Sequence, residues 1–82
     1  MIFHKDISDR ELASFLKNKT IGLAGNKKLK IYGTLTCKSG KRMKMENRVF
    51  FESEYEAVEL GYRPCGHCLR LQYEKWLFDK FI

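Results

Sequence analysis

Residues 61–68 of this 82-residue chain read Gly-Tyr-Arg-Pro-Cys-Gly-His-Cys. The two cysteines, Cys65 and Cys68, are three positions apart. At this spacing both thiolates can face one metal ion while backbone N–H groups point at the sulfur atoms. The same spacing occurs in redox-active pairs, but a thioredoxin-like pair needs strand–helix–strand units around it, and this chain is too short for them. The motif therefore predicts part of a metal site.

Cys37 is the third cysteine, and it lies in a segment rich in glycine and lysine, where a residue that only packs in a core is not expected. Three thiolates leave one position of a tetrahedral zinc ion without a ligand. We predict that His4 folds back to fill this position. Asp6, His67 and water are the alternatives, although a side chain between paired cysteines normally projects away from their shared ion. Spacing alone does not separate zinc from iron. The predicted ligands of a Zn²⁺ ion are Cys37, Cys65, Cys68 and His4.

The size of the chain also favours a metal. At 9.7 kDa it allows one domain, residues 1–82, and a domain this small often needs a disulfide or a metal to stabilise its core. A content of 13% aromatic residues excludes a disordered tail. No uncharged run exceeds seven residues, and the first residues are too charged for a signal peptide. We therefore expect a reduced, cytoplasmic protein without membrane contact.

Helix starts are indicated by two capping boxes, in which a serine is followed three positions later by a glutamate. The box at 8–11 precedes apolar residues at helical spacing and predicts a helix over about 9–18. The box at 53–56 begins a second helix, which Gly61 ends. Apolar positions repeat at helical spacing over 69–78, so we predict a last helix that starts at the second cysteine of the pair.

Three short apolar runs predict strands. The runs 21–24 and 29–32 flank the turn residues Gly25 and Asn26, and predict the two arms of a β-hairpin. The run 48–51 is rich in β-forming residues and predicts a third strand. The expected fold class is a small zinc-stabilised α+β domain, with a short antiparallel sheet of about three strands flanked by helices.

The positive charge of the chain is concentrated in one segment. Residues 27–48 hold eight basic residues and one acid, a net charge of +7, whereas the other sixty residues sum to −1. A basic segment beside a predicted metal ligand is typical of a protein that binds a polyanion, and nucleic acid is the expected partner. A solvated surface loop and an acidic protein partner are the alternatives. The expected phosphate contacts are Lys38, Lys41, Arg42, Lys44 and Arg48.

The order of these motifs resembles the metal-binding domain of the Ada family of bacterial DNA methylphosphotriester repair and regulatory proteins. The resemblance rests on the run Asn47–Phe51, on Glu56 with Ala57, and on the ending at residues 61–68. It implies a small α+β domain in which four cysteines hold zinc and which contacts the DNA backbone. It further implies that one of the first two cysteines accepts a methyl group from a phosphotriester.

This chain departs from the pattern at one position. Gly33 stands where the family has its first, methyl-accepting cysteine, and Cys37 stands where it has the second. The resemblance then implies the fold, three zinc ligands and a DNA repair or regulatory setting, but no methyl transfer. A rival alignment places Cys37 on the acceptor position and Lys41 on the next cysteine. It keeps Cys37 as the methyl acceptor of an enzyme. However, it needs a three-residue deletion before Asn47 instead of a one-residue insertion. We therefore predict a zinc-binding module that contacts the nucleic-acid backbone.

Overall fold

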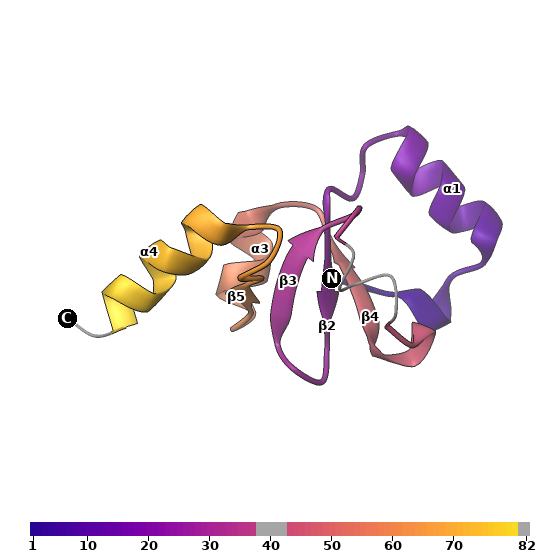
Figure 1. Ribbon diagram of the computed structural model, residues 1–82. Coiled ribbons are helices and arrows are strands. Elements are labelled where there is room, and N and C mark those ends of the chain that lie inside the picture. The colour runs from indigo at the N-terminus through magenta and orange to yellow at the C-terminus, as the bar shows by residue number, and fades with distance from the viewer. Residues whose placement is uncertain (38–42, 81–82) are drawn as a thin grey trace.

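The computed structural model describes residues 1–37 and 43–80, and in this part of the chain a five-stranded sheet is accompanied by three α-helices (Figure 1). The strands are β1 (Ile2–Phe3), β2 (Leu23–Asn26), β3 (Ile31–Thr34), β4 (Arg48–Phe51) and β5 (Arg63–Pro64). The helices are α1 (Asp9–Lys17), α3 (Glu54–Glu59) and α4 (Arg70–Lys80), with 3-10 turns η1 (His4–Asp6) and η2 (Met45–Asn47).

The α+β class is confirmed, but the expectation of about three antiparallel strands is wrong. The sheet has five strands in the order β1-β4-β2-β3-β5, and β5 runs parallel to β3, so the sheet is mixed. The two strands that the sequence did not predict, β1 and β5, are only two residues long. A run of two residues is too short to show the alternation by which a strand is predicted.

The predicted hairpin exists, but both arms lie two residues further along the chain. The side chain of Asn26 causes this shift, because its Oδ1 atom accepts hydrogen bonds from the N–H groups of Lys28 and Leu29, at 3.0 and 3.1 Å. Asn26 is therefore the last residue of β2 and starts the turn, which continues to Lys30 in a left-handed backbone conformation (φ 58°).

The helix starts follow from the capping residues. The first capping box forms in full, since Ser8 and Glu11 each accept a hydrogen bond from the backbone N–H of the other, both at 3.1 Å. At the second helix the Ser53 hydroxyl caps the N–H of Glu56, at 3.3 Å. The last helix begins at Arg70, two residues after the predicted start at Cys68. No helix in the described ranges combines the length and the hydrophobicity needed to cross a membrane.

The strand register assigns the side chains of the sheet to two faces. Tyr32 in β3 is paired with Gly25 in β2, and Gly25 is paired in turn with Val49 in β4, so Tyr32 and Val49 point to the same face as Phe51. This face forms the hydrophobic core against α3 and Tyr62. Gly33 is opposite Ala24, and Ala24 is opposite Phe50, so these three residues share the other face. The core therefore occupies one face of the sheet and leaves the other face for the site described below.

Candidate metal centre

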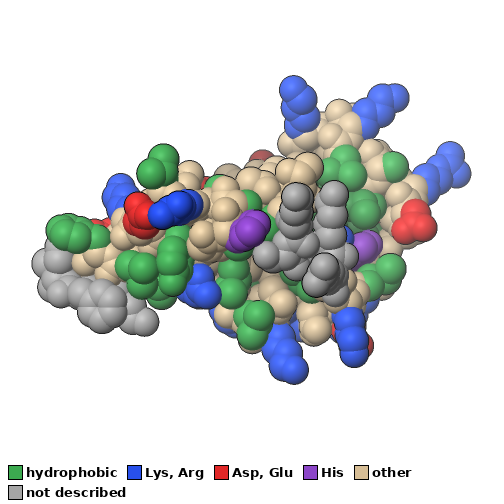
Figure 2. Space-filling view, in the orientation of Figure 1, with side chains coloured by type: hydrophobic (Ala, Val, Ile, Leu, Met, Phe, Trp, Pro, Cys, Tyr) green, Lys and Arg blue, Asp and Glu red, His purple; other side chains and the backbone are tan. Residues whose placement is uncertain are grey.

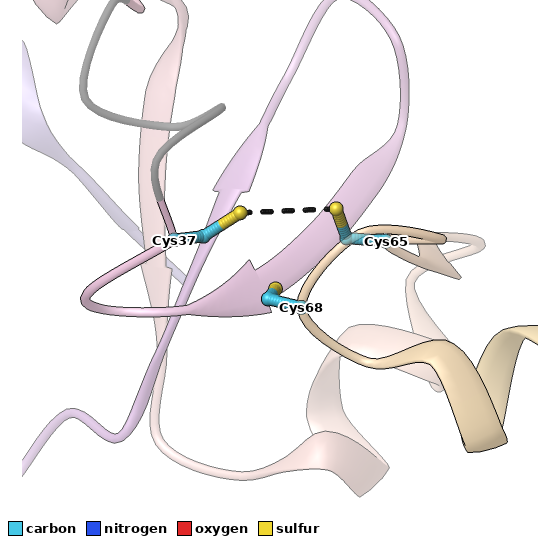
Figure 3. A group of neighbouring side chains, drawn as sticks. All are labelled: Cys37, Cys65 and Cys68. Carbon is cyan, nitrogen blue, oxygen red and sulfur yellow. Dashed lines mark hydrogen bonds between the residues drawn. The ribbon is translucent and has the colours of Figure 1, made fainter.

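The three cysteines of the chain lie together. Their Sγ atoms are all within 4.8 Å of one another, and those of Cys37 and Cys65 are 3.8 Å apart and point toward each other (Figure 3). In a tetrahedral zinc site with Zn–S bonds of about 2.3 Å, neighbouring sulfur atoms are about 3.8 Å apart. Cys37 and Cys65 therefore have the spacing of two ligands of one tetrahedral ion, and the Sγ atom of Cys68 lies within 4.8 Å of both.

The sheet brings these cysteines together from distant parts of the sequence. Cys37 follows β3 through a tight turn, in which its N–H donates to the carbonyl oxygen of Thr34 at 3.2 Å. Cys65 follows β5, and its N–H donates to the carbonyl oxygen of Tyr32 in β3 at 2.7 Å. Because β3 and β5 run parallel, their ends meet at one edge, and Cys37 meets the cysteine pair there.

Two backbone N–H groups point at sulfur atoms, as the spacing of the pair predicts. The N–H of Thr34 donates to Sγ of Cys68 at 3.3 Å, and the N–H of His67 donates to Sγ of Cys65 at 3.4 Å. Such bonds stabilise the thiolate form and orient the sulfur atoms toward a shared ion.

Burial has the opposite effect on one of these thiols. It raises the pKa of Cys68 above its ordinary value, and the hydrogen bond from the N–H of Thr34 only partly offsets this rise. Without a metal, Cys68 is therefore protonated at neutral pH, and an incoming metal ion must displace the proton because the thiolate is the ligand.

Metal affinity should consequently rise with pH. A lower pH favours the protonated thiol and competes with the metal, so each thiol that loses its proton adds up to about tenfold in affinity per pH unit. Competition with a chromophoric chelator at about pH 6, 7 and 8 measures this dependence. An affinity that does not change over this range would show that the bound metal displaces no thiol protons.

Gly33 faces the same cluster. A Cβ atom at this position would lie 2.8 Å from Sγ of Cys68 and 3.3 Å from Cβ of Cys65. Gly33 is buried, and positive φ among the described glycines is found only at Gly61, so the backbone at Gly33 does not require a glycine. The missing side chain would thus point into the group of thiols.

The family model described as the metal binding domain of Ada matches residues 18–70, a segment that contains all three cysteines and Gly33. This chain belongs to the Ada metal-binding domain family. It is also 40% identical over 55 residues to an uncharacterized protein of Methanocaldococcus jannaschii. That match covers 66% of this chain and 27% of the archaeal protein, so the chain spans about a quarter of this relative's length. No solved structure matches the chain.

Membership of the Ada family explains why it matters that a side chain at position 33 would point at the thiols. In the preferred alignment Gly33 takes the place of the family's first cysteine, and a side chain at this position would reach the other ligands. The rival alignment would instead need Lys41 in a ligand position, and Lys41 lies outside the described residues. The geometry at Gly33 supports the preferred alignment.

The histidines and Asp6 do not join the group of ligand atoms. His4 lies in η1, where its ring packs edge-on against Phe50 with ring centroids 5.3 Å apart. Phe50 is on the same face of the sheet as Gly33, but β2 lies between their strands. His67 is exposed, as expected for a side chain between paired cysteines, and Asp6 is exposed in η1. The structure therefore does not bring His4 to the thiols, and its role as a ligand stays a prediction.

A cavity of about 320 Å³ borders the thiols. It lies against Gly33, Cys37 and Cys65, and its other walls include both apolar and polar side chains. No sequence pattern indicates this cavity, because it forms only where Gly33 in β3 faces the turn that holds Cys65.

The predicted phosphate contacts are only partly described. Lys38, Lys41 and Arg42 lie outside the described residues, whereas Lys44 is exposed before η2 and Arg48 begins β4. The N–H of Lys27 donates to the carbonyl oxygen of Asn47 at 2.7 Å, which places the β2–β3 turn beside η2. In Figure 2, which has the orientation of Figure 1, Lys and Arg side chains project at the lower edge of the molecule, where the β2–β3 turn lies. We call this region the basic end and define it by Lys27, Lys28, Lys44 and Arg48.

Proposed function

We propose that this domain is a zinc-binding module that contacts the nucleic-acid backbone. The observation that carries the metal part is the group of three Sγ atoms within 4.8 Å of one another. Sets of thiolates select zinc or iron, and zinc is the ion that the Ada resemblance implies. Cys37, Cys65 and Cys68 would hold the ion, which supplies folding energy by joining the end of β3 to the turn that precedes α4.

The nucleic-acid part of the proposal is supported by the distribution of charge. The basic end joins lysines from the β2–β3 turn to Lys44 and Arg48, which were separate in the sequence, and Glu46 is the one acid within residues 27–48. Clusters of lysine and arginine bind phosphate groups without contacting the bases. Binding should therefore be independent of the nucleotide sequence and sensitive to salt. Lys38, Lys41 and Arg42 would extend these contacts from the segment that follows Cys37.

Replacing Lys28 and Lys44 with alanine should weaken binding to DNA duplexes of unrelated sequence to the same extent. Both side chains are exposed, so the fold should be retained. The slope of log K against log salt should fall in magnitude by about 0.9 for each lost phosphate contact. Fluorescence anisotropy at several salt concentrations measures both effects.

The matched control replaces Lys17 in α1 and Lys75 in α4, which are also exposed and remove the same charge from other elements. If the control weakens binding as much as the test variant, net charge alone is responsible and the basic end has no special role. If neither variant changes binding, the basic end is only a solvated surface. Lys41→Ala combined with Arg42→Ala applies the same test to the segment after Cys37.

The alternative function, methyl transfer to Cys37, is less well supported. A methyl acceptor needs a thiolate that is accessible to its substrate, whereas Cys37 is buried, with 7% of its surface exposed, and its sulfur faces that of Cys65. Incubation with DNA that carries methylphosphotriesters should therefore leave the mass of the protein unchanged. A gain of one methyl group, mapped to Cys37 by peptide mass spectrometry, would favour the enzyme.

A further inference from the structure

The metal site has fewer ligands than a tetrahedral ion needs. Of all His, Cys, Asp and Glu side chains in residues 1–37 and 43–80, three cysteines form the group of ligand atoms. Residues 38–42 and 80–82 contain none of these four residue types. One coordination position is therefore left without a thiol, imidazole or carboxylate ligand from the group.

Gly33 lies between the thiols and the cavity that borders them. A cysteine at Gly33 would direct its Cβ into the group of thiols, 2.8 Å from Sγ of Cys68. With glycine there, the chain supplies no ligand from this position and Sγ of Cys68 lies in the direction of the absent Cβ, while the 320 Å³ cavity borders Gly33, Cys37 and Cys65. A ligand from solution would therefore reach the site from the cavity, beside Cys37 and Cys65.

The walls of the cavity suit the body of such a ligand. Ala24, Leu29, Ile31 and Met43 supply apolar surface, and the volume is at the lower end of the range for small-molecule sites, about 300–1,000 Å³. Arg63 also lines the cavity, and its guanidinium group lies over the Tyr73 ring, 5.1 Å from the ring centroid. Its positive charge favours an anionic sulfur over a neutral donor.

We propose that the sulfur of a small thiol takes the fourth coordination position of the metal, from the cavity that borders Gly33, Cys37 and Cys65. The proposal rests on the proposed metal site. On binding, the thiol gives its proton to the solvent and its sulfur donates an electron pair to the ion, so no oxidant or reductant is required. Soft thiolate donors suit an ion that already has three of them.

Cobalt(II) tests this proposal, because its absorption spectrum reports the number of thiolate ligands. The full chain is reduced with a phosphine, freed of thiols, loaded with cobalt and titrated with 2-mercaptoethanol at constant pH. We expect a three-thiolate spectrum at the start and a saturable rise in the thiolate-to-cobalt absorption. Gly33→Cys should begin with the four-thiolate spectrum and should not respond to the added thiol.

Two histidine variants and one cavity-filling variant complete the experiment. His4→Ala and His67→Ala should have the starting spectrum and the response of the unmodified protein. Ala24→Leu fills the cavity from the neighbouring strand and keeps all three cysteines, and it should weaken the response to thiol by about tenfold or more.

The outcomes separate this proposal from the metal site on which it rests. An unmodified protein that shows the three-thiolate spectrum but no response to the thiol would overturn the proposal and leave the metal site intact. A changed starting spectrum in His4→Ala or His67→Ala would also overturn it, because an imidazole of the chain would then fill the fourth position. A protein without any thiolate-to-cobalt absorption would contradict the metal site itself.

Discussion

Chelation of the metal, or the substitution Cys65→Ser, should unfold the domain. The buried core is small: Tyr32, Val49, Phe51, Ala57 and Tyr62 form its cluster, all on one face of the sheet. On the other face, the cysteines join the end of β3 to the turn before α4. Zinc binding in small domains contributes about 10–16 kcal/mol of apparent free energy, which is comparable to the whole stability of a typical domain, about 5–15 kcal/mol.

Circular dichroism and thermal unfolding, with and without a strong chelator, measure this effect. We expect the chelated protein and the Cys65→Ser variant to lose their cooperative transition, and excess zinc to restore it only in the chelated protein. Thr36→Ser, an exposed position beside Cys37, is the matched control and should behave as the unmodified protein. A chelated protein with its native spectrum and an unchanged melting temperature would show that the metal does not stabilise the fold.

Gly33→Cys should tighten metal binding by about tenfold or more, the scale on which changes around a metal site act. The new Cβ would lie too close to Sγ of Cys68, at 2.8 Å, but this sulfur is the end of a side chain and can move when four thiolates share one ion. The backbone at Gly33 does not have a positive φ, so a cysteine is accepted without strain in the main chain.

Gly33→Val is the matched variant, because it adds a side chain of similar volume that cannot bind a metal. It should weaken metal affinity, since its methyl groups occupy the space between Cys68 and Cys65. Zinc competition with a chromophoric chelator measures both affinities. Equal weakening by the two substitutions would mean that Gly33 is required for packing, and that its position does not correspond to a lost ligand.

Features governed by local chemistry could be predicted from the sequence. Ser8 and Glu11 fixed the start of α1, because a capping box needs only residues of one helical turn. The spacing of Cys65 and Cys68 indicated a metal site, and the structure brings Cys37 to the pair. The hairpin was predicted two residues too early, because the bonds to the Asn26 side chain, and not the order of apolar residues, set the position of the turn.

Features that depend on contacts between distant segments could not be predicted. β1 and β5 have two residues each, and they are strands only because β4 and β3 lie beside them. The position of His4 against Phe50, rather than beside the thiols, follows from the pairing of β1 with β4, which no local pattern shows. The cavity at Gly33 likewise exists only after β3 and the cysteine turn have come together.

The central claim is that Cys37, Cys65 and Cys68 hold one metal ion. Metal analysis of the purified protein, combined with X-ray absorption spectroscopy at the zinc edge, tests it most directly. We predict one zinc ion for each chain, with at least three sulfur ligands at about 2.3 Å. A protein without a stoichiometric metal, or an ion surrounded mainly by nitrogen and oxygen, would contradict the claim.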